Sequence, residues 1–127
     1  MSQDKTTKPM ILYVDDEKEN LTSFKFMFRN RYRIHIAESA EIGLELIRKL
    51  LIKVVISDQR MPGTTGVQFL EMIADEFPES IRMILTGYSD MDVIIEGINK
   101  GKIFHYLMKP WQEDEVKLAI QHAFEIV

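Results

Sequence analysis

The stretch Met10-Ile11-Leu12-Tyr13-Val14-Asp15-Asp16-Glu17 decides the fold class. Five apolar residues in a row are followed directly by three carboxylates. A short, continuously apolar run that is bounded so sharply is typical of a strand buried on both faces, as in the middle of a parallel sheet. The stretch therefore predicts an α/β fold with charged groups at the carboxyl ends of its strands.

Four further short runs, rich in β-branched or aromatic residues, follow along the chain, and the segments between them have helical spacing. The five predicted strands are Met10–Val14, Arg33–Ala37, Lys53–Ser57, Arg82–Thr86 and Phe104–Met108. Strict alternation of strand and helix predicts a parallel sheet with helices on both faces. The second and fifth runs are interrupted by polar residues, which indicates edge strands. We predict the flavodoxin-like (βα)5 doubly wound fold, with strand order 2-1-3-4-5.

Local signals at the predicted helices support this division of the chain. We expect N-caps at Ser39 and Ser89 and a capping box formed by Thr65 and Gln68. One apolar stripe that we expect to be buried comprises Ala40, Leu44, Ile47 and Leu51. We also expect the Trp111 ring to pack beneath the turn that follows Lys109-Pro110, although an exposed position facing a partner is the alternative.

Composition narrows the class of protein. The chain has 127 residues, a net charge of −4 from 16 basic and 20 acidic residues, and no cysteine. This length indicates one domain, and we assign residues 1–8 to a flexible tail and residues 9–127 to the domain. Disulfides, thiolate zinc sites and cysteine nucleophiles are excluded. The acidic balance and the lack of a long apolar run favour a cytoplasmic protein that binds neither nucleic acid nor membrane directly.

Chemically useful side chains stand at four of the five predicted strand ends. Asp15 and Asp16 follow the first strand, Asp58 follows the third, Thr86 ends the fourth, and Lys109 follows the fifth. In an open α/β sheet these ends meet at one edge, near the point where the strand order reverses. Each residue alone has an ordinary interpretation, such as a turn cap at Asp58 or a solvated helix start at Asp15-Asp16. Together they predict a functional site.

Clustered carboxylates repel one another and are commonly held together by a cation. An all-oxygen ligand set with few carboxylates suits Mg²⁺. A lysine and a hydroxyl nearby match the oxygens of a phosphoryl group. An aspartate carboxylate is itself a possible phosphoryl acceptor.

The sequence resembles the receiver domain of bacterial two-component response regulators from Pro9 to Val127. The resemblance lies in four segments, namely residues 11–17, Ser57-Asp58-Gln59-Arg60-Met61-Pro62-Gly63, Leu85-Thr86-Gly87-Tyr88 and Met108-Lys109-Pro110-Trp111. It implies that Asp58 accepts a phosphoryl group from a sensor histidine kinase or a phosphotransfer protein. It also implies a Mg²⁺ site made by Asp15, Asp16, Asp58 and the backbone carbonyl of Arg60.

Further roles follow from the same resemblance. Thr86 and Lys109 would hold the phosphoryl oxygens, Tyr106 would be the switching aromatic, and Lys109-Pro110 would be a cis peptide. The fourth helix, fifth strand and fifth helix would engage an output domain or partner, or form a homodimer. Such a domain is no enzyme beyond its own phosphorylation and dephosphorylation. Arg60 and Tyr88 would flank the path of the hydrolytic water, and their size predicts slow hydrolysis.

A narrower resemblance links the same motifs to receivers joined to HD-GYP cyclic-di-GMP phosphodiesterases and to receivers of some hybrid sensor proteins. Two other classes remain to be separated. One is a pseudo-receiver that binds proteins without being phosphorylated, which the intact site residues argue against. The other is an aspartate-dependent phosphohydrolase of the haloacid-dehalogenase type, which would place an Asp-x-Asp motif after the first strand, where this chain has Asp15-Asp16-Glu17.

Overall fold

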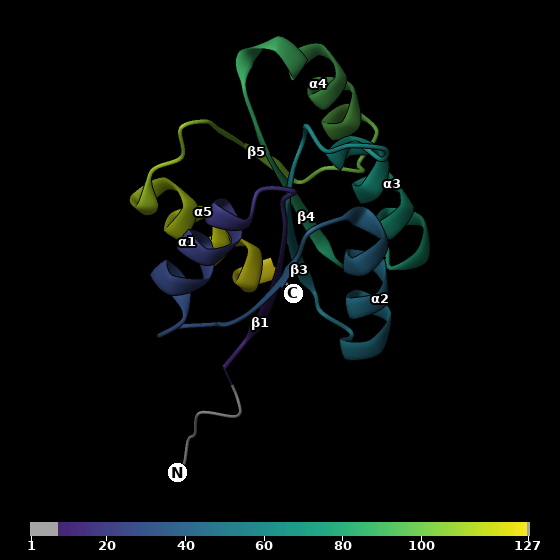
Figure 1. Ribbon diagram of the computed structural model, residues 1–127. Helices are drawn as coiled ribbons and strands as arrows, with labels where there is room; N and C mark the ends of the chain where they lie inside the picture. Colours follow the sequence, from purple (N-terminus) through teal and green to yellow (C-terminus); the bar gives the residue numbers. More distant parts are fainter. Residues whose placement is uncertain (1–7, 127) are drawn as a thin grey trace.

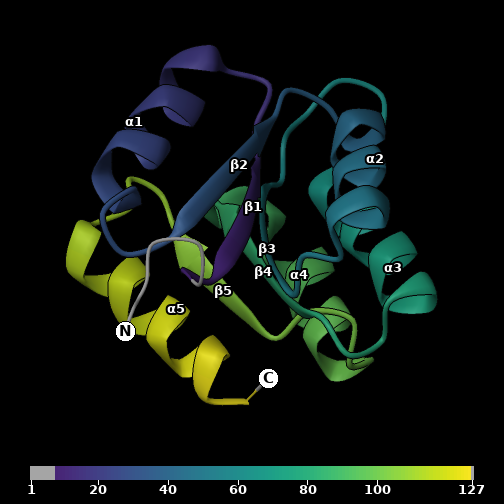
Figure 2. The same cartoon turned by 90° about the horizontal axis from the view of Figure 1, so that it is seen from below.

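A five-stranded parallel sheet runs through the centre of the molecule and carries helices on both faces (Figures 1 and 2). The computed structural model describes residues 8–126, so most of the predicted tail lies outside the described residues. The strands are β1 (Met10–Val14), β2 (Arg33–Ala37), β3 (Val54–Asp58), β4 (Ile81–Thr86) and β5 (His105–Met108). The helices are α1 (Lys18–Phe28), α2 (Ala40–Leu50), α3 (Gly66–Glu76), α4 (Met91–Asn99) and α5 (Glu113–Ile126), with a short 3-10 helix, η2 (Tyr88–Asp90), before α4.

The strand order is β2-β1-β3-β4-β5, which confirms the predicted topology with β2 and β5 at the edges. The order in which successive strands are added to the sheet reverses between β1 and β3. These two strands are neighbours, so their carboxyl ends lie side by side. Strand β3 begins and ends one residue later than predicted, which makes Asp58 the last residue of the strand. Because Asp58 remains in the ladder with β4, its backbone is fixed by the sheet.

The sheet divides the core into two layers. On one face, Ile11 and Tyr13 pack with α1 and α5, and on the other, Leu12 and Val14 pack with α2, α3 and α4. This alternation is the period of two expected for a strand, with both faces apolar because both are covered. The Trp111 ring packs against the α1 side of the first layer, 5.9 Å from the ring centre of Phe24, so the packed position expected for this residue is confirmed.

Most of the predicted helix starts are confirmed. The Ser39 hydroxyl accepts a hydrogen bond from the Ile42 amide at 3.2 Å and caps α2. At the start of α3, Thr65 and Gln68 form both hydrogen bonds of a capping box. These caps satisfy amides that the helices cannot pair internally.

Two local predictions were wrong. Leu51 does not continue the buried stripe of α2, because the chain turns there into the left-handed region (φ 55°) and leaves the side chain 66% exposed. Ser89 does not cap α4, because the chain first makes the 3-10 turn η2 and Asp90 takes the cap position. Among residues 8–126, no helix is long and apolar enough to cross a membrane.

Candidate functional site

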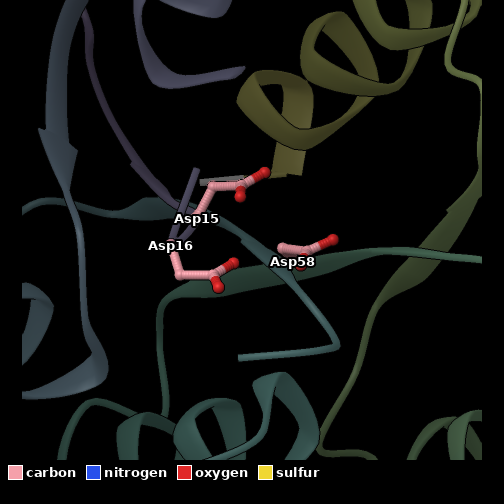
Figure 3. Close-up of side chains that lie close together, drawn as sticks. All are labelled: Asp15, Asp16 and Asp58. Atoms are coloured by element: carbon pink, nitrogen blue, oxygen red, sulfur yellow. The ribbon is translucent and has the colours of Figure 1, made fainter. Parts of the chain in front are cut away.

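Three aspartates from two neighbouring strands meet at the carboxyl edge of the sheet (Figure 3). One carboxylate oxygen from each of Asp15, Asp16 and Asp58 lies within 4.8 Å of the other two. Asp15 and Asp58 are buried, whereas Asp16 is exposed to solvent. The cluster thus offers oxygen ligands only, two of them buried and one open to solvent. This donor set fits a hard divalent cation that keeps part of its water shell.

The carboxylate of Asp15 is held in place by three donors. The Tyr13 hydroxyl donates to Oδ2 at 2.7 Å, the Asn20 amide donates to the same oxygen at 3.1 Å, and the Glu17 backbone N–H donates to Oδ1 at 3.0 Å. Burial, followed by the charge of Asp15, raises the pKa of Tyr13 well above its usual range, so this hydroxyl stays protonated and remains a donor. The supporting roles of Tyr13 and Asn20 were not predicted from the sequence, although Tyr13 lies in β1 only two residues before Asp15.

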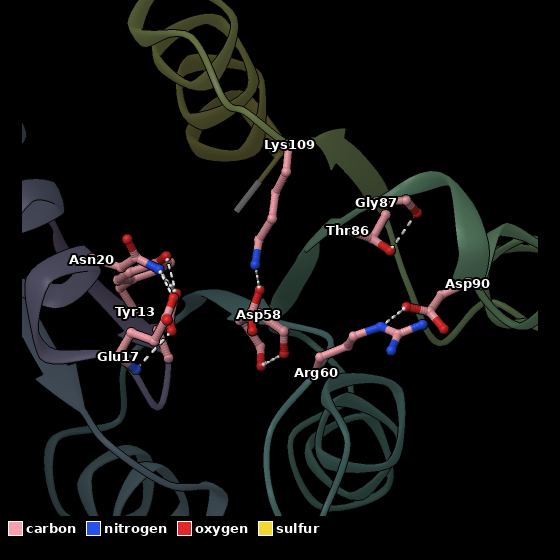
Figure 4. Close-up of polar contacts among 11 residues, drawn as sticks. Tyr13, Glu17, Asn20, Asp58, Arg60, Thr86, Gly87, Asp90 and Lys109 are labelled. Carbon is pink, nitrogen blue, oxygen red and sulfur yellow. Dashed lines mark hydrogen bonds and ion pairs between the residues drawn. The ribbon is translucent and has the colours of Figure 1, made fainter.

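Among the carboxylates of residues 8–126 that form ion pairs, Asp58 has the least exposed side chain. Its side chain is 4% exposed and forms an ion pair with the Lys109 ammonium, which reaches across from the loop after β5 (Figure 4). Burial raises the pKa of Asp58, and the charge of Asp15 adds to this effect, whereas Lys109 opposes it. The Lys109 charge therefore offsets part of the cost of burying the Asp58 carboxylate.

The backbone around Asp58 depends on a glycine that sequence reasoning missed. A Cβ atom on Gly66, the first residue of α3, would lie 2.3 Å from the carbonyl oxygen of Asp58 and 2.9 Å from Cα of Gln59. Without that atom, the Gly66 amide donates to the Gln59 carbonyl at 2.9 Å, and the Gln59 side chain accepts from the Val67 amide at 2.8 Å. The end of β3 is thereby tied to the start of α3.

Thr86 and Tyr106 occupy the neighbouring strands. Thr86 is buried at the last position of β4, and its hydroxyl donates to the Gly87 carbonyl at 3.0 Å (Figure 4). Tyr106 is half-buried in β5 and packs against the core layer formed with α2, α3 and α4. The Lys109-Pro110 peptide bond is cis, as the resemblance implies.

The side chain of Arg60 points away from the acidic cluster. Its Nε donates to a carboxylate oxygen of Asp90 at 3.1 Å (Figure 4). A terminal nitrogen donates to the Ser89 hydroxyl at 2.8 Å, so Arg60 joins the loop after β3 to the start of α4. The Arg60 side chain is 72% exposed. No donor among the described residues bonds to the Arg60 carbonyl oxygen, which leaves this atom free to act as a ligand.

Fold and site together define a flavodoxin-like domain with a cluster of acidic side chains at the point where the strand order reverses. Residues 11–121 match the family model of the response regulator receiver domain, and the chain belongs to this family. It is therefore a signalling module of two-component systems and not a haloacid-dehalogenase-type hydrolase.

Several known proteins are similar to this chain. The hydrogenase transcriptional regulatory protein HoxA of Cupriavidus necator is 34% identical over 115 residues, which cover 91% of this chain but only 24% of HoxA. The chain thus spans about a quarter of that relative. A receiver domain from Clostridium thermocellum superposes with a TM-score of 0.88 at 32% identity, covering 92% of this chain and 94% of that one. The signal receiver domain of an HD domain-containing protein from Pseudomonas fluorescens Pf-5 gives 0.87 at 34% identity, covering 93% and 95%.

Proposed function

We propose that Asp58 accepts a phosphoryl group from the phosphohistidine of a sensor histidine kinase or a phosphotransfer protein. The observation that carries this proposal is the environment of Asp58, a buried carboxylate paired with Lys109 and grouped with Asp15 and Asp16 at the open end of the sheet. A pseudo-receiver has no need to keep three carboxylates and a lysine together at this energetic cost.

In the proposed transfer, an Asp58 carboxylate oxygen attacks phosphorus while the bond from phosphorus to the histidine nitrogen breaks, and that bond's electron pair returns to the imidazole. Asp15, Asp16, Asp58 and the Arg60 carbonyl are the proposed Mg²⁺ ligands, and the bound ion would neutralise charge on the phosphoryl oxygens. The Lys109 ammonium stays beside the site and offsets the charge that the new phosphoryl group brings.

The proposed switch begins at Thr86. Its hydroxyl, bonded to the Gly87 carbonyl in the structure, turns to donate to a phosphoryl oxygen, and the Tyr106 ring moves into the space that the threonine leaves. Gly87 leaves this path open, since a Cβ at that position would meet nothing within 4 Å. We propose that α4, β5 and α5 carry the change to an output domain, a partner or a second copy. Exposed apolar side chains on these elements and the loop before β5 support this surface, namely Val93, Ile95, Phe104 and Leu118.

We further propose that residues 9–127 form the receiver unit of a longer cytoplasmic regulator that binds neither nucleic acid nor membrane through this domain. The motif likeness to receivers of HD-GYP phosphodiesterases favours an output of that type. The similarity to a receiver whose protein contains an HD domain supports the same choice. Sequencing the gene beyond the codon for Val127 tests this part of the proposal, which a DNA-binding output would contradict.

Phosphorylation by a small donor tests the transfer without the unknown kinase. The parent protein, Asp58→Asn and the exposed-site control Asp114→Asn are incubated with acetyl phosphate and Mg²⁺ and weighed by intact-mass spectrometry. We expect the parent and the control to gain one phosphoryl group and Asp58→Asn to gain none, and we expect chelation of Mg²⁺ to stop the reaction. Equal phosphorylation of all three proteins would refute the assignment of Asp58, and no reaction of the parent would favour the pseudo-receiver.

The switch is tested separately with beryllofluoride, which imitates a phosphoryl group on a carboxylate. We expect its NMR shift changes to extend from Asp58 into α4, β5 and α5 in the parent, and to stay near Asp58 in Thr86→Ala. Changes confined to α1 and α2 would contradict the proposed route.

A further inference from the structure

One part of this acidic protein carries only positive charge. Between Glu19 and Glu38 the chain has 18 residues without an acidic side chain, whereas its net charge is −4. The cations within this stretch are Lys25, Arg29, Arg31 and Arg33. The stretch covers most of α1, the turn after it and strand β2, all remote in sequence from the phosphoacceptor Asp58.

The fold gathers three of these cations, Lys25, Arg29 and Arg33, around a groove of about 460 Å³ between the end of α1 and β2. The groove is lined mainly by Lys8, Lys25, Arg29, Tyr32, Arg33 and His35. None of its lysines and arginines forms a salt bridge with a carboxylate in the part of the chain that the structure describes, whereas Arg48 and Lys102 elsewhere on the surface do. The groove therefore has positive charge that the protein itself does not neutralise.

Two contacts hold parts of this surface in position. The Lys8 ammonium donates to the Arg29 backbone carbonyl at 3.4 Å, which places the start of the described chain beside the end of α1. The Arg29 guanidinium lies 4.4 Å from the centre of the Phe26 ring, a cation–π arrangement that leaves its N–H groups available at the rim.

Strand β2 offers an unpaired backbone beside these charges. Within residues 8–126 it is an edge strand that pairs only with β1, and Figure 2 shows it between α1 and α2. The Arg33 N–H donates to the Pro9 carbonyl and the Ala37 carbonyl accepts from the Asp15 N–H, so these residues of β2 face β1. Because the direction of backbone groups alternates along a strand, the N–H and C=O groups of Ile34 and Ile36 face the open side.

His35 adds an unsatisfied group to the groove. Its Nε2 is buried and has no hydrogen-bond partner among residues 8–126. Burial, followed by the charges of Arg33 and Lys25, lowers the pKa of His35, so the ring is neutral at pH 7 and adds no further charge. A buried ring nitrogen without a partner is costly unless a ligand or solvent satisfies it.

We propose that this groove binds an extended, acidic segment of a partner protein, which pairs as an additional strand with the open edge of β2. Backbone groups of the segment would bond to Ile34 and Ile36, and its carboxylates would face Lys25, Arg29 and Arg33. The free strand edge favours a peptide over a nucleic acid or a lipid surface, since neither of these has a backbone that continues a β-ladder. The inference does not depend on phosphorylation of Asp58.

A fluorescent peptide of alternating glutamate and valine, added to the full chain, is the probe. We expect fluorescence anisotropy to show binding that weakens as salt is added. Arg29→Glu/Arg33→Glu should weaken it at least about tenfold, the loss expected when attractive charge pairs become repulsive. Lys49→Glu/Lys100→Glu is the matched control, because each lysine or arginine changed to glutamate lowers the net charge by 2 and both double variants reach −8. Equal weakening of peptide binding in both double variants would overturn the proposed binding site.

A second measurement separates strand pairing from simple charge attraction. We expect the bound peptide to slow hydrogen exchange at the amides of Ile34 and Ile36 in the parent. If Arg29→Glu/Arg33→Glu melts abnormally in a circular dichroism scan, Arg29→Gln/Arg33→Gln replaces it, and a smaller loss of affinity is expected. Unchanged exchange at both amides would overturn the proposal, as would binding of an oligonucleotide or an anionic phospholipid vesicle that is tighter than binding of the peptide.

Discussion

Replacing Gly66 by alanine probes the backbone that supports Asp58, the proposed phosphoacceptor. The new Cβ would lie 2.3 Å from the Asp58 carbonyl oxygen and 2.9 Å from Cα of Gln59. Both neighbours are backbone atoms, and Asp58 is paired with β4, so neither can move away without distorting the end of β3. The substitution should therefore have two effects: it should destabilise the domain and it should displace Asp58.

The expected loss of stability follows from the steric overlap of the new Cβ with the backbone. Forcing extra volume into a closely packed position costs about 1–3 kcal/mol. Unfolding entropy of about 2.1 cal/mol/K per residue gives about 0.27 kcal/mol/K for a chain of this length, so the melting temperature should fall by about 4–11 °C. The phosphorylation rate with acetyl phosphate should fall as well, because the nucleophile is moved relative to Asp15 and Lys109.

Two other glycines serve as controls measured by the same thermal scan. A Cβ on Gly87 would meet nothing within 4 Å, so Gly87→Ala should leave stability nearly unchanged. A Cβ on Gly97 would lie 2.6 Å from the terminal carbon of Ile103, which can rotate, and alanine recovers about 1 kcal/mol within a helix. Gly97→Ala should therefore be close to neutral. A Gly66→Ala protein that melts within about 1 °C of the parent would refute the reasoning.

Three further predictions concern charge and hydrogen bonding. Asp58→Asn should stabilise the domain at pH 7, because the raised pKa of Asp58 makes stability decline as pH rises through that value; equal urea midpoints for variant and parent at pH 7 would contradict this. Tyr13→Phe should cost about 1.5–3 kcal/mol for a lost bond to a charged group. It should also remove a decline in stability above about pH 10, where an unfolded tyrosine ionises but the buried one, with its raised pKa, does not. Arg60→Asn should shorten the lifetime of the phosphoprotein. Asp90→Ala should lengthen it, because it frees the Arg60 guanidinium to reach the phosphoryl group. Lifetimes that change in the same direction in both variants would count against a shielding role of Arg60.

The fold could be predicted because local patterns agree with the tertiary structure. Continuous apolar runs identified the central strands, and interrupted runs identified β2 and β5 as edges. The ends of parallel strands must share one edge of the sheet, so the convergence of Asp15, Asp58 and Thr86 followed from their positions alone. The comparison with the receiver family agrees with this assignment.

Details that depend on a single backbone turn were not predictable in the same way. Leu51 continues the helical period of α2 in the sequence. The helix ends at Leu50, however, and Leu51 itself adopts the left-handed conformation. Ser89 is a good cap by residue type, but η2 occupies the position where the helix was expected to begin. In both cases the periodicity is correct and the boundary is wrong by a residue or two.

The supporting contacts of the site could not be read from residue types. The Tyr13 hydroxyl donates to Asp15 only because the tyrosine, near the end of β1, reaches the carboxylate that follows the strand. The contact of Arg60 with Asp90 joins the loop after β3 to the start of α4, 30 residues apart in sequence. The need for glycine at position 66 comes from the close approach of the Asp58 carbonyl, which residue types alone do not show.

Chemical trapping of the phosphorylated residue tests the central claim most directly. The parent is phosphorylated with acetyl phosphate and Mg²⁺, reduced with borohydride, which converts an aspartyl phosphate to homoserine, and digested for peptide sequencing by mass spectrometry. The account predicts homoserine at position 58 and at no other aspartate. Homoserine at Asp15 or Asp16, with Asp58 unchanged, would contradict it.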